Sequence, residues 1–398
     1  MGDVNKALTI AYVAKLSSPS LFDRFFGSVD VKPAQQVQKY HRLMAEGLAA
    51  NENVDVIAIG APPLSRAITK KVFFRETKLS EGGVAYGSPR LINIPILLQL
   101  SLFFGTFTHV RRACRLNKNN AVVCDILNVS MVAAALLAAK LAGAKTVGIV
   151  TDLPGFVKTR TSGLISAITN FLLSQFSHYV LLTEQMNAVV NKKKRPYVVV
   201  EGQADIRMKE RENDLQHKTP GYLCMYAGSL NRANGIEILV AAFMEADISG
   251  AKLQIYGSGD YENQLKEMCK KNDNIKFDGA VSNEIVVEKQ LKAALLVNPL
   301  PTNQEFTKYS FPSKTLECMV SGTPLLTTKL PGMPAEYYPY VYLLEDETVS
   351  GLKKALRDLL CKPVEELHEK GILAKAFILE QKNNIAQARK IVDMIEHA

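Results

Sequence analysis

Short apolar runs alternate with stretches of helical periodicity along almost the whole chain. An apolar run of about four to eight residues between turn residues is typical of a buried strand, and amphipathic stretches between such runs are typical of helices that cover a sheet. The strand candidates of the first half are residues 8–13, 54–59, 122–125, 146–150, 179–182 and 197–200. This alternation predicts a parallel sheet with helices on both faces.

The alternation starts afresh after a charged, turn-rich stretch. Strand candidates follow at residues 223–227, 253–256 and 275–277. We therefore predict an α/β protein with two facing Rossmann-like, doubly wound domains. The predicted limits are 1–202 for the first domain, 203–220 for a linker, 221–372 for the second domain, and 373–398 for a C-terminal helix that packs back on the first domain or pairs with another chain.

Composition fits a globular protein. The chain has 398 residues, 47% of them hydrophobic, which is enough for two separate cores. Its six cysteines form no CxxC pair and have no histidine at metal-ligand spacing, so we expect a reducing compartment and no metal site. The N-terminus lacks the basic start, apolar core and cleavage site of a signal peptide, so we expect a cytoplasmic location.

Charge is shared unevenly between the two halves. Residues 1–218 hold 28 Lys and Arg against 16 Asp and Glu, whereas residues 219–398 hold 20 against 23. The basic first half suggests an anionic surface or substrate, with candidate clusters at 111–118 and 192–195, although each cluster alone is also compatible with solvated helix ends. Nucleic acid is not expected, because these runs lack interleaved aromatic residues.

One apolar run, residues 91–107, raises the question of a membrane segment. It is interrupted by Asn93, Pro95 and Gln99, whereas a span needs about 20 mostly apolar residues. We favour a buried helix here, and the alternative is a helix that lies at a membrane interface.

The stretch from residue 306 to 324, FTKYSFPSKTLECMVSGTP, combines a proline-containing loop with a predicted helix start. Ser313 stands where an N-cap is expected, and Lys314 follows in the first turn. Free N–H groups and a lysine at a helix start favour an anion, and Glu317 can accept paired hydrogen bonds from a ribose diol. The pattern predicts a pocket for a nucleotide diphosphate, and the alternative is an ordinary capped helix with solvated charges.

Several segments together resemble one known family. YAGSLNRANGIEILVAAF, LQIYGSGD, IKFDGAV, LVNPLP and YSFPSKTLECMVSGTP occur in this order over about 160 residues, and they resemble the nucleotide-sugar domain of GT-B glycosyltransferases of family 4, the glycosyl transferases group 1. The first half is similar to the family only in its α/β rhythm.

The resemblance implies roles for particular residues. Glu317 corresponds to the glutamate that binds the ribose hydroxyls, and the preceding loop implies diphosphate contacts through Phe311, Ser313 and Lys314. Gly228 and Ser229 correspond to a glycine-containing loop that lets the diphosphate approach the backbone. Gly257 resembles a second such turn. For Gly259, in the same turn, we expect only the structural role of a tight strand-to-helix turn. The segment from Gly279 to Val281 is expected near the base.

The chain departs from the family pattern in two respects. Many relatives carry a glutamate eight positions before the ribose-binding one, where this chain has Tyr309, which can itself hydrogen-bond a sugar hydroxyl. Many relatives also carry an Arg and a Lys that clamp the phosphates, where this chain has Ser229 and Asn234. Arg232 and Lys314 are the candidate substitutes.

The catalytic partner is expected in the first half. Asp152 follows an apolar strand, so it should lie at the strand's carboxyl end and orient or deprotonate the acceptor hydroxyl. The alternative is an N-cap for a helix that starts near Leu153 and Pro154. Asp125 is a weaker candidate by the same geometry, and His109 and His178 are expected to have structural roles.

These expectations define a transferase. It should move a sugar from a nucleotide-diphosphate donor, a UDP-sugar in the first instance, to a hydroxyl of a saccharide or lipid-linked acceptor. The resemblance implies retention of configuration without a metal or other cofactor, and the basic first half suggests peripheral contact with an anionic membrane. Two alternatives stay open, namely a nucleotide-sugar epimerase and a catalytically inactive, donor-binding partner subunit.

Overall fold

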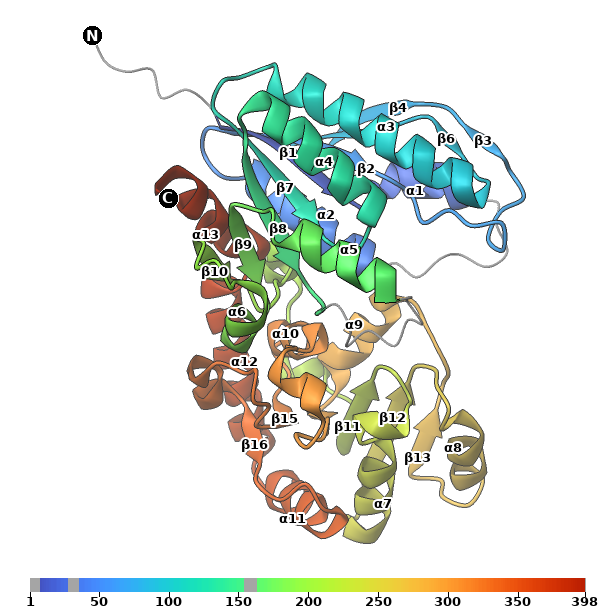
Figure 1. Cartoon of the computed structure of the whole chain (residues 1–398). Helices are drawn as coiled ribbons and strands as arrows, with labels where there is room; N and C mark the ends of the chain where they lie inside the picture. Colours follow the sequence, from blue (N-terminus) through green and yellow to red (C-terminus); the bar gives the residue numbers. More distant parts are fainter. Residues whose placement is uncertain (1–7, 28–35, 154–162, 398) are drawn as a thin grey trace. The chain divides into compact units, whose positions relative to one another are not determined.

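The computed structural model describes residues 8–27, 36–153 and 163–397 and divides the chain into two compact units (Figure 1). The first unit comprises Met1–Gln203 and Asn384–Ala398, and the second comprises Ala204–Asn383. The first is therefore built from two separate stretches of chain. Each unit contains one large sheet covered by helices, which confirms the predicted α/β class.

The first unit holds an eight-stranded sheet in the order β10-β9-β8-β7-β1-β2-β5-β4. Neighbouring strands are parallel except β4 and β5, which are antiparallel. Nearly every residue of the central strands is buried, as expected when helices cover both faces. The strands are β1 (Leu8–Ala14), β2 (Val54–Gly60), β4 (Thr77–Glu81), β5 (Val84–Ser88), β7 (Asn120–Asp125), β8 (Lys145–Val150), β9 (His178–Leu181) and β10 (Tyr197–Val199).

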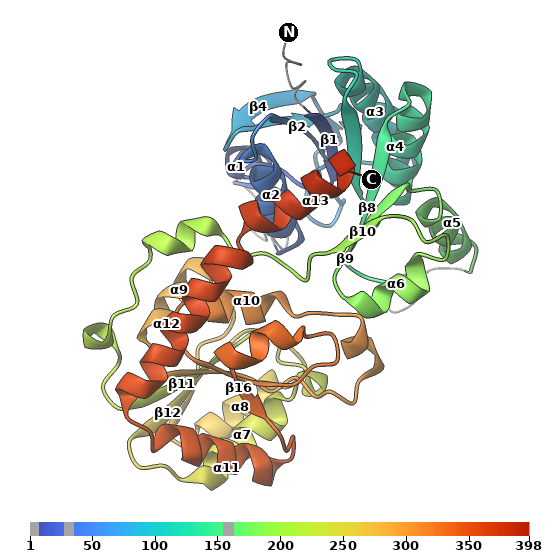
Figure 2. The ribbon, with the colours of Figure 1, turned by 90° about the vertical axis from the view of Figure 1, so that its left-hand side faces the viewer.

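Two layers of helices cover this sheet. On one face α3 (Pro95–Cys114) lies beside α4 (Val129–Ala142), followed by α5 (Gly163–Leu173) (Figure 1). On the other face α2 (Gln36–Ala49) lies beside α13 (Asn384–His397), so the end of the chain completes the first unit (Figure 2). The remaining elements are α1 (Pro19–Phe26), α6 (Glu184–Val190) and a two-stranded pair, β3 (Phe73–Phe74) with β6 (Leu91–Ile92).

The second unit holds a six-stranded, all-parallel sheet in the order β13-β12-β11-β14-β15-β16. This is the doubly wound order, which reverses between β11 and β14. Its strands are β11 (Tyr222–Ala227), β12 (Ala251–Tyr256), β13 (Ile275–Phe277), β14 (Leu295–Asn298), β15 (Leu325–Thr328) and β16 (Tyr342–Leu344). Its α-helices are α7 (Ile236–Ala246), α8 (Glu262–Cys269), α9 (Asn283–Lys292), α10 (Ser313–Val320), α11 (Val349–Leu360) and α12 (Val364–Gln381).

The structure places some chain segments differently from the sequence-based limits. Residues 203–220 contain two short 3-10 helices, η1 (Ile206–Glu210) and η2 (Leu215–His217), both in contact with α12. The predicted limit at residue 372 falls inside α12, which packs against α10 and belongs to the second unit. Only α13 returns to the first unit.

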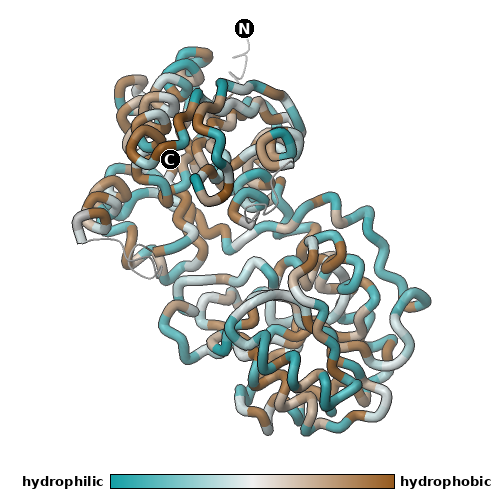
Figure 3. The backbone as a smooth tube through the Cα atoms, turned by 90° about the vertical axis from the view of Figure 1, so that its right-hand side faces the viewer, coloured by the Kyte–Doolittle hydropathy of each residue, from teal (hydrophilic) through white to brown (hydrophobic). Residues whose placement is uncertain are grey.

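The prediction of a buried helix over residues 91–107 is wrong. The segment forms β6 and most of α3, but the side chains of Ile96, Leu100 and Phe104 are exposed. The helix is apolar around most of its circumference, and only one side of it can lie against the sheet. Figure 3 shows brown, hydrophobic stretches along helices of this unit. No helix in the described ranges is long and apolar enough to cross a membrane.

Candidate functional site

Three glycine-containing loops lie together at the carboxyl ends of the adjacent strands β11, β12 and β13, beside the point where the strand order of the second unit reverses. Parallel sheets of this order bind ligands at this edge. The amide of Gly228 donates to the carbonyl of Tyr256 (3.0 Å), and the amide of Gly257 donates to the carbonyl of Gly279 (2.9 Å). The predicted residues Gly228, Gly257 and Gly279 therefore belong to one hydrogen-bonded set of loops.

Gly257 cannot carry a side chain in this arrangement. Its φ is +134°, and a Cβ atom would lie 1.8 Å from the carbonyl oxygen of Gly228. The two loops touch backbone to backbone, so the surface that they present is made of main-chain groups. Gly279, with a φ of +73°, borders open space instead.

Lys314 reaches this loop set from α10. Its Nζ lies 3.5 Å from the hydroxyl of Tyr226 and 4.7 Å from the centre of that ring, and a Cβ on Gly228 would lie 3.5 Å from it. Burial lowers the pKa of Lys314 to about 8. Among the described residues no carboxylate forms an ion pair with this ammonium group, so it is available to an anion at the loops.

The start of α10 differs by one residue from the prediction. Pro312 is the N-cap and Ser313 is the first helical residue, so the predicted N-cap role of Ser313 is wrong. The fixed φ of proline, here −65°, suits the position before the first turn, and the amide of Thr315 donates to the Pro312 carbonyl (2.9 Å). Glu317 lies four residues after Ser313 and hence on the same side of the helix.

The loop before α10 is anchored by the buried ring of Phe311. This ring packs against Tyr337 with centroids 5.1 Å apart. Only backbone groups of Phe311 can therefore face a ligand. Tyr309 follows the short 3-10 helix η4 (Glu305–Lys308), and Val281 follows β13 and is partly buried.

Arg232 is already paired with neighbouring side chains. Its Nη1 lies 2.6 Å from Oε2 of Glu237, and its guanidinium stands over the ring of Tyr261 at 5.4 Å. The carbonyl of Ser229 accepts hydrogen bonds from Tyr226 (2.8 Å) and from the Asn234 amide (3.2 Å). The structure therefore favours Lys314 over Arg232 as the cation of this site.

The two candidate aspartates, Asp125 and Asp152, lie at the carboxyl ends of adjacent strands of the first unit. Asp125 ends β7, and Asp152 follows β8 by two residues. Asp152 keeps solvent contact, yet the protein removes part of its hydration, and this desolvation together with the nearby charge of Asp125 raises its pKa. Leu153 is the last described residue here, so the alternative helix start at Pro154 lies outside the described residues.

Asp125 is held by a buried network that sequence reasoning did not identify. Nε2 of His41 lies 3.4 Å from Oδ2 of Asp125, and Nδ1 of the same ring lies 2.7 Å from the hydroxyl of Tyr12. All three side chains are buried. These contacts, with the hydrogen bond from the Leu127 amide to Oδ1, hold the Asp125 carboxyl group in place at the end of β7.

Comparison with known proteins identifies the second unit. Residues 221–362 match the family described as Glycosyl transferases group 1. The second unit is therefore a group 1 glycosyltransferase domain. The predicted resemblance is confirmed, and so is the enzyme class. A search of curated proteins finds no match to the sequence of this glycosyltransferase.

Solved structures share the fold of this glycosyltransferase over nearly its full length. HepE of Anabaena in complex with UDP has a TM-score of 0.62 and 12% identity, over 98% of this chain and 100% of the other. Sucrose-phosphate synthase of Thermosynechococcus elongatus has a TM-score of 0.64 and 14% identity, over 98% of both chains. The lipopolysaccharide outer core galactosyltransferase WaaB, in its apo form, has a TM-score of 0.59 and 12% identity, over 98% of this chain and 99% of the other. At such identities the likeness establishes the fold, which is GT-B.

Two further residues of the transferase were missed from the sequence. Tyr226 links Lys314 to the Ser229 carbonyl, and its only sequence signal is a tyrosine two residues before a glycine at a strand end. The amide of Asn298, at the carboxyl end of β14, is buried, and neither of its polar atoms has a hydrogen-bond partner within the described residues. Both lie on strands that flank the reversal point of the sheet order.

His109 and His178 have partners outside this site. Nδ1 of His109 lies 2.8 Å from the Gly105 carbonyl within α3, and Nδ1 of His178 lies 2.8 Å from the hydroxyl of Ser177.

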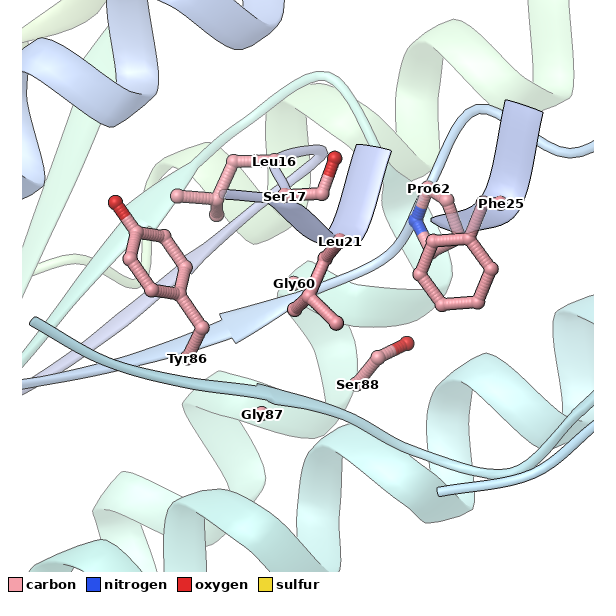
Figure 4. Close-up of a pocket in the computed structure, with 9 residues that line it drawn as sticks. All are labelled: Leu16, Ser17, Leu21, Phe25, Gly60, Pro62, Tyr86, Gly87 and Ser88. Atoms are coloured by element: carbon pink, nitrogen blue, oxygen red, sulfur yellow. The ribbon is translucent and has the colours of Figure 1, made fainter. Parts of the chain in front are cut away.

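In the first unit of the transferase, a small recess opens at the ends of β1, β2 and β5 and against α1 (Figure 4). Its lining is mostly apolar and includes Leu16, Leu21, Phe25 and Tyr86.

Proposed function

We propose that this glycosyltransferase transfers a sugar from a UDP-sugar to a hydroxyl of a saccharide or lipid-linked acceptor, with retention of configuration and without a metal. The observation that carries the proposal is the ammonium group of Lys314 beside the backbone of Gly228, at the strand-order reversal of the second unit. The likeness to HepE in complex with UDP supports uracil as the base. The likeness to WaaB, which acts on lipopolysaccharide, supports a lipid-linked acceptor.

The donor half of the mechanism follows from these groups. The diphosphate lies against the loops of Gly228 and Gly257, where no side chain keeps it from the backbone. Lys314 and the free amides at the start of α10 stabilise the negative charge that develops as UDP leaves. Glu317 accepts hydrogen bonds from the ribose hydroxyls, and Tyr309 contacts the sugar.

The acceptor half of the mechanism assigns one role to the first unit. The acceptor oxygen attacks the anomeric carbon on the face from which UDP departs, and its proton passes to the departing phosphate. Asp152 orients the acceptor hydroxyl through a hydrogen bond.

The predicted cytoplasmic location of the enzyme remains a prediction.

The first test is calorimetric binding of UDP, GDP, ADP and CMP to the wild-type chain and to Glu317→Ala, without added metal. We expect selective binding of UDP and a loss of about 10-fold or more in Glu317→Ala, because two hydrogen bonds to a charged group disappear. Glu305→Ala, in η4, is the matched control and should bind UDP as the wild type does. No nucleotide binding at all would overturn the proposal.

A second measurement separates the remaining alternatives. The UDP-sugar is incubated with the enzyme alone and then with extracted acceptor lipids, and the products are resolved by chromatography. A transferase gives a glycosylated lipid only in the second case. A new nucleotide sugar formed without acceptor would identify an epimerase, and UDP-sugar binding without any product would favour an inactive partner subunit, which Tyr309 in place of the usual glutamate makes worth testing.

A further inference from the structure

A row of exposed apolar side chains follows one line along α3 in the first unit. Ile96, Leu100 and Phe104 are spaced four residues apart, so they point to the same side of the helix. Ile96 is 76% exposed and Phe104 is 62% exposed. Phe73 of the neighbouring β3 is 70% exposed, and Figure 1 shows β3 and β6 near the start of α3. We call Phe73, Ile96, Leu97, Leu100 and Phe104 the apolar face.

This face is fixed to a basic segment. The amide of Asn93, just before α3, donates to the carbonyl of Val72 (2.7 Å), and its side chain donates to the carbonyls of Thr69 and Lys71 (both 3.1 Å). These bonds hold residues 69–72 at the start of α3. The stretch from residue 66 to 75 around them, which we call the basic segment, has no acidic residue, and its four basic side chains are exposed: Arg66, Lys70, Lys71 and Arg75.

Acidic residues are almost absent from this part of the chain. Between Gly82 and Thr183 the only ones are Asp125 and Asp152, both at strand ends, so α3, α4 and α5 carry none. Glu76 contacts α3, and its carboxylate is engaged by His109 (3.4 Å), Lys78 (3.5 Å) and Arg112 (3.9 Å). The outer helices of this layer also carry exposed apolar side chains, namely Leu137, Leu141, Ile165, Ile168 and Phe171.

We propose that the apolar face docks the transferase on the surface of an anionic lipid bilayer, with the basic segment on the lipid phosphates. An apolar row flanked by cations and free of acidic side chains is what a bilayer interface selects. A protein partner of ordinary composition would present both acidic and basic groups. The apolar face has no acidic side chain that could pair with the basic groups of such a partner. The inference concerns where the enzyme binds, and it does not depend on the proposed transfer reaction.

The test is binding of the full chain to vesicles of phosphatidylglycerol and phosphatidylcholine, compared with vesicles of phosphatidylcholine alone, by flotation. The double variant Ile96→Glu, Phe104→Glu should bind anionic vesicles roughly 100-fold more weakly, because each buried apolar side chain contributes roughly 10-fold. Lys70→Ala with Lys71→Ala should weaken binding roughly 5-fold per charge, an effect that disappears at high salt.

Leu373→Glu in α12 is the matched control, because Leu373 is also an exposed apolar helix residue (52%) but belongs to the second unit. It should bind vesicles as the wild type does. UDP binding and the melting temperature of every variant should stay unchanged, since none of these residues belongs to the donor site. The proposal is overturned if the wild type ignores anionic vesicles, if the double variant binds them undiminished, or if sedimentation shows that the face joins two copies of the chain instead.

Discussion

At the scale of single residues, the proposed function makes donor binding depend on the ammonium group of Lys314. Lys314→Ala should weaken UDP binding by about 10- to 100-fold, the effect of losing hydrogen bonds between charged groups. Arg232→Ala should change it by less than about 3-fold, because that guanidinium is already paired with Glu237. Calorimetry on both variants is the measurement, and a larger loss for Arg232→Ala would contradict the assignment.

The pH dependence of UDP binding should report the same lysine. Burial lowers the pKa of Lys314 to about 8, so the free enzyme loses this charge as the pH rises through that value. The dissociation constant of UDP should then rise by up to 10-fold per pH unit between about pH 8 and 10. Lys314→Arg keeps its charge throughout this range and should show a flat profile over it.

Asp152 should affect catalysis and stability in opposite directions. Its pKa is raised in the folded chain, so folding is favoured by the protonated form, and this contribution is lost as the pH rises through the folded-state pKa. Asp152→Asn should therefore melt higher than the wild type at pH 7, with a difference that shrinks below the ordinary aspartate pKa. Its turnover should fall about 100-fold or more while UDP binding is kept. An unchanged turnover would remove Asp152 from the mechanism.

At the scale of elements, the contact between two loops of the second unit makes one glycine indispensable. Gly257→Ala places a Cβ atom against the Gly228 carbonyl and should lower the free energy of unfolding by about 2 kcal/mol or more, with loss of UDP binding. Gly279→Ala is the control, because open space surrounds that position and only the backbone conformation is strained, by about 1 kcal/mol. Denaturant unfolding of both variants checks the difference.

The positions of the strands could be predicted from the sequence more completely than the exposure of the helices or the partners of individual side chains. The predicted strand at 146–150 lies within β8 and that at 253–256 within β12, because a short apolar run between turn residues is long enough for a buried strand and too short for a helix. The exposure of α3 could not be predicted, since a helix that is apolar on nearly all sides does not indicate which side meets the sheet. The same limit applies to Tyr226 and His41, whose partners come from distant parts of the chain.

At the scale of the whole molecule, the last helix belongs to the first unit. Ala388, Ile391, Val392 and Ile395 of α13 are buried in the same core as Met44 and Leu48 of α2. The side chain of Asn384 donates to the Leu43 carbonyl (3.2 Å), and that of Gln387 donates to the Gly202 carbonyl (2.8 Å). A chain that ends at Asn383 should therefore lose stability in the first unit.

Hydrogen exchange would test this prediction. In the shortened chain the amides of α2 and β2 should exchange at least about 100-fold faster, because the loss of several buried apolar side chains removes several kcal/mol. The amides of β11 and β12 in the second unit should keep their protection, since α13 contributes nothing to that core. Faster exchange in both units alike would show that they unfold together.

The return of α13 to the first unit also fixes the order in which the protein can be completed during synthesis. Domains generally fold as units while the chain leaves the ribosome. Here the first half emerges first but lacks α13, the helix that packs beside α2, and α13 is translated only after the whole second unit. We expect the second unit, although it begins only at residue 204, to reach its native state before the first unit, whose apolar surface over α2 stays open to chaperones until α13 has been translated.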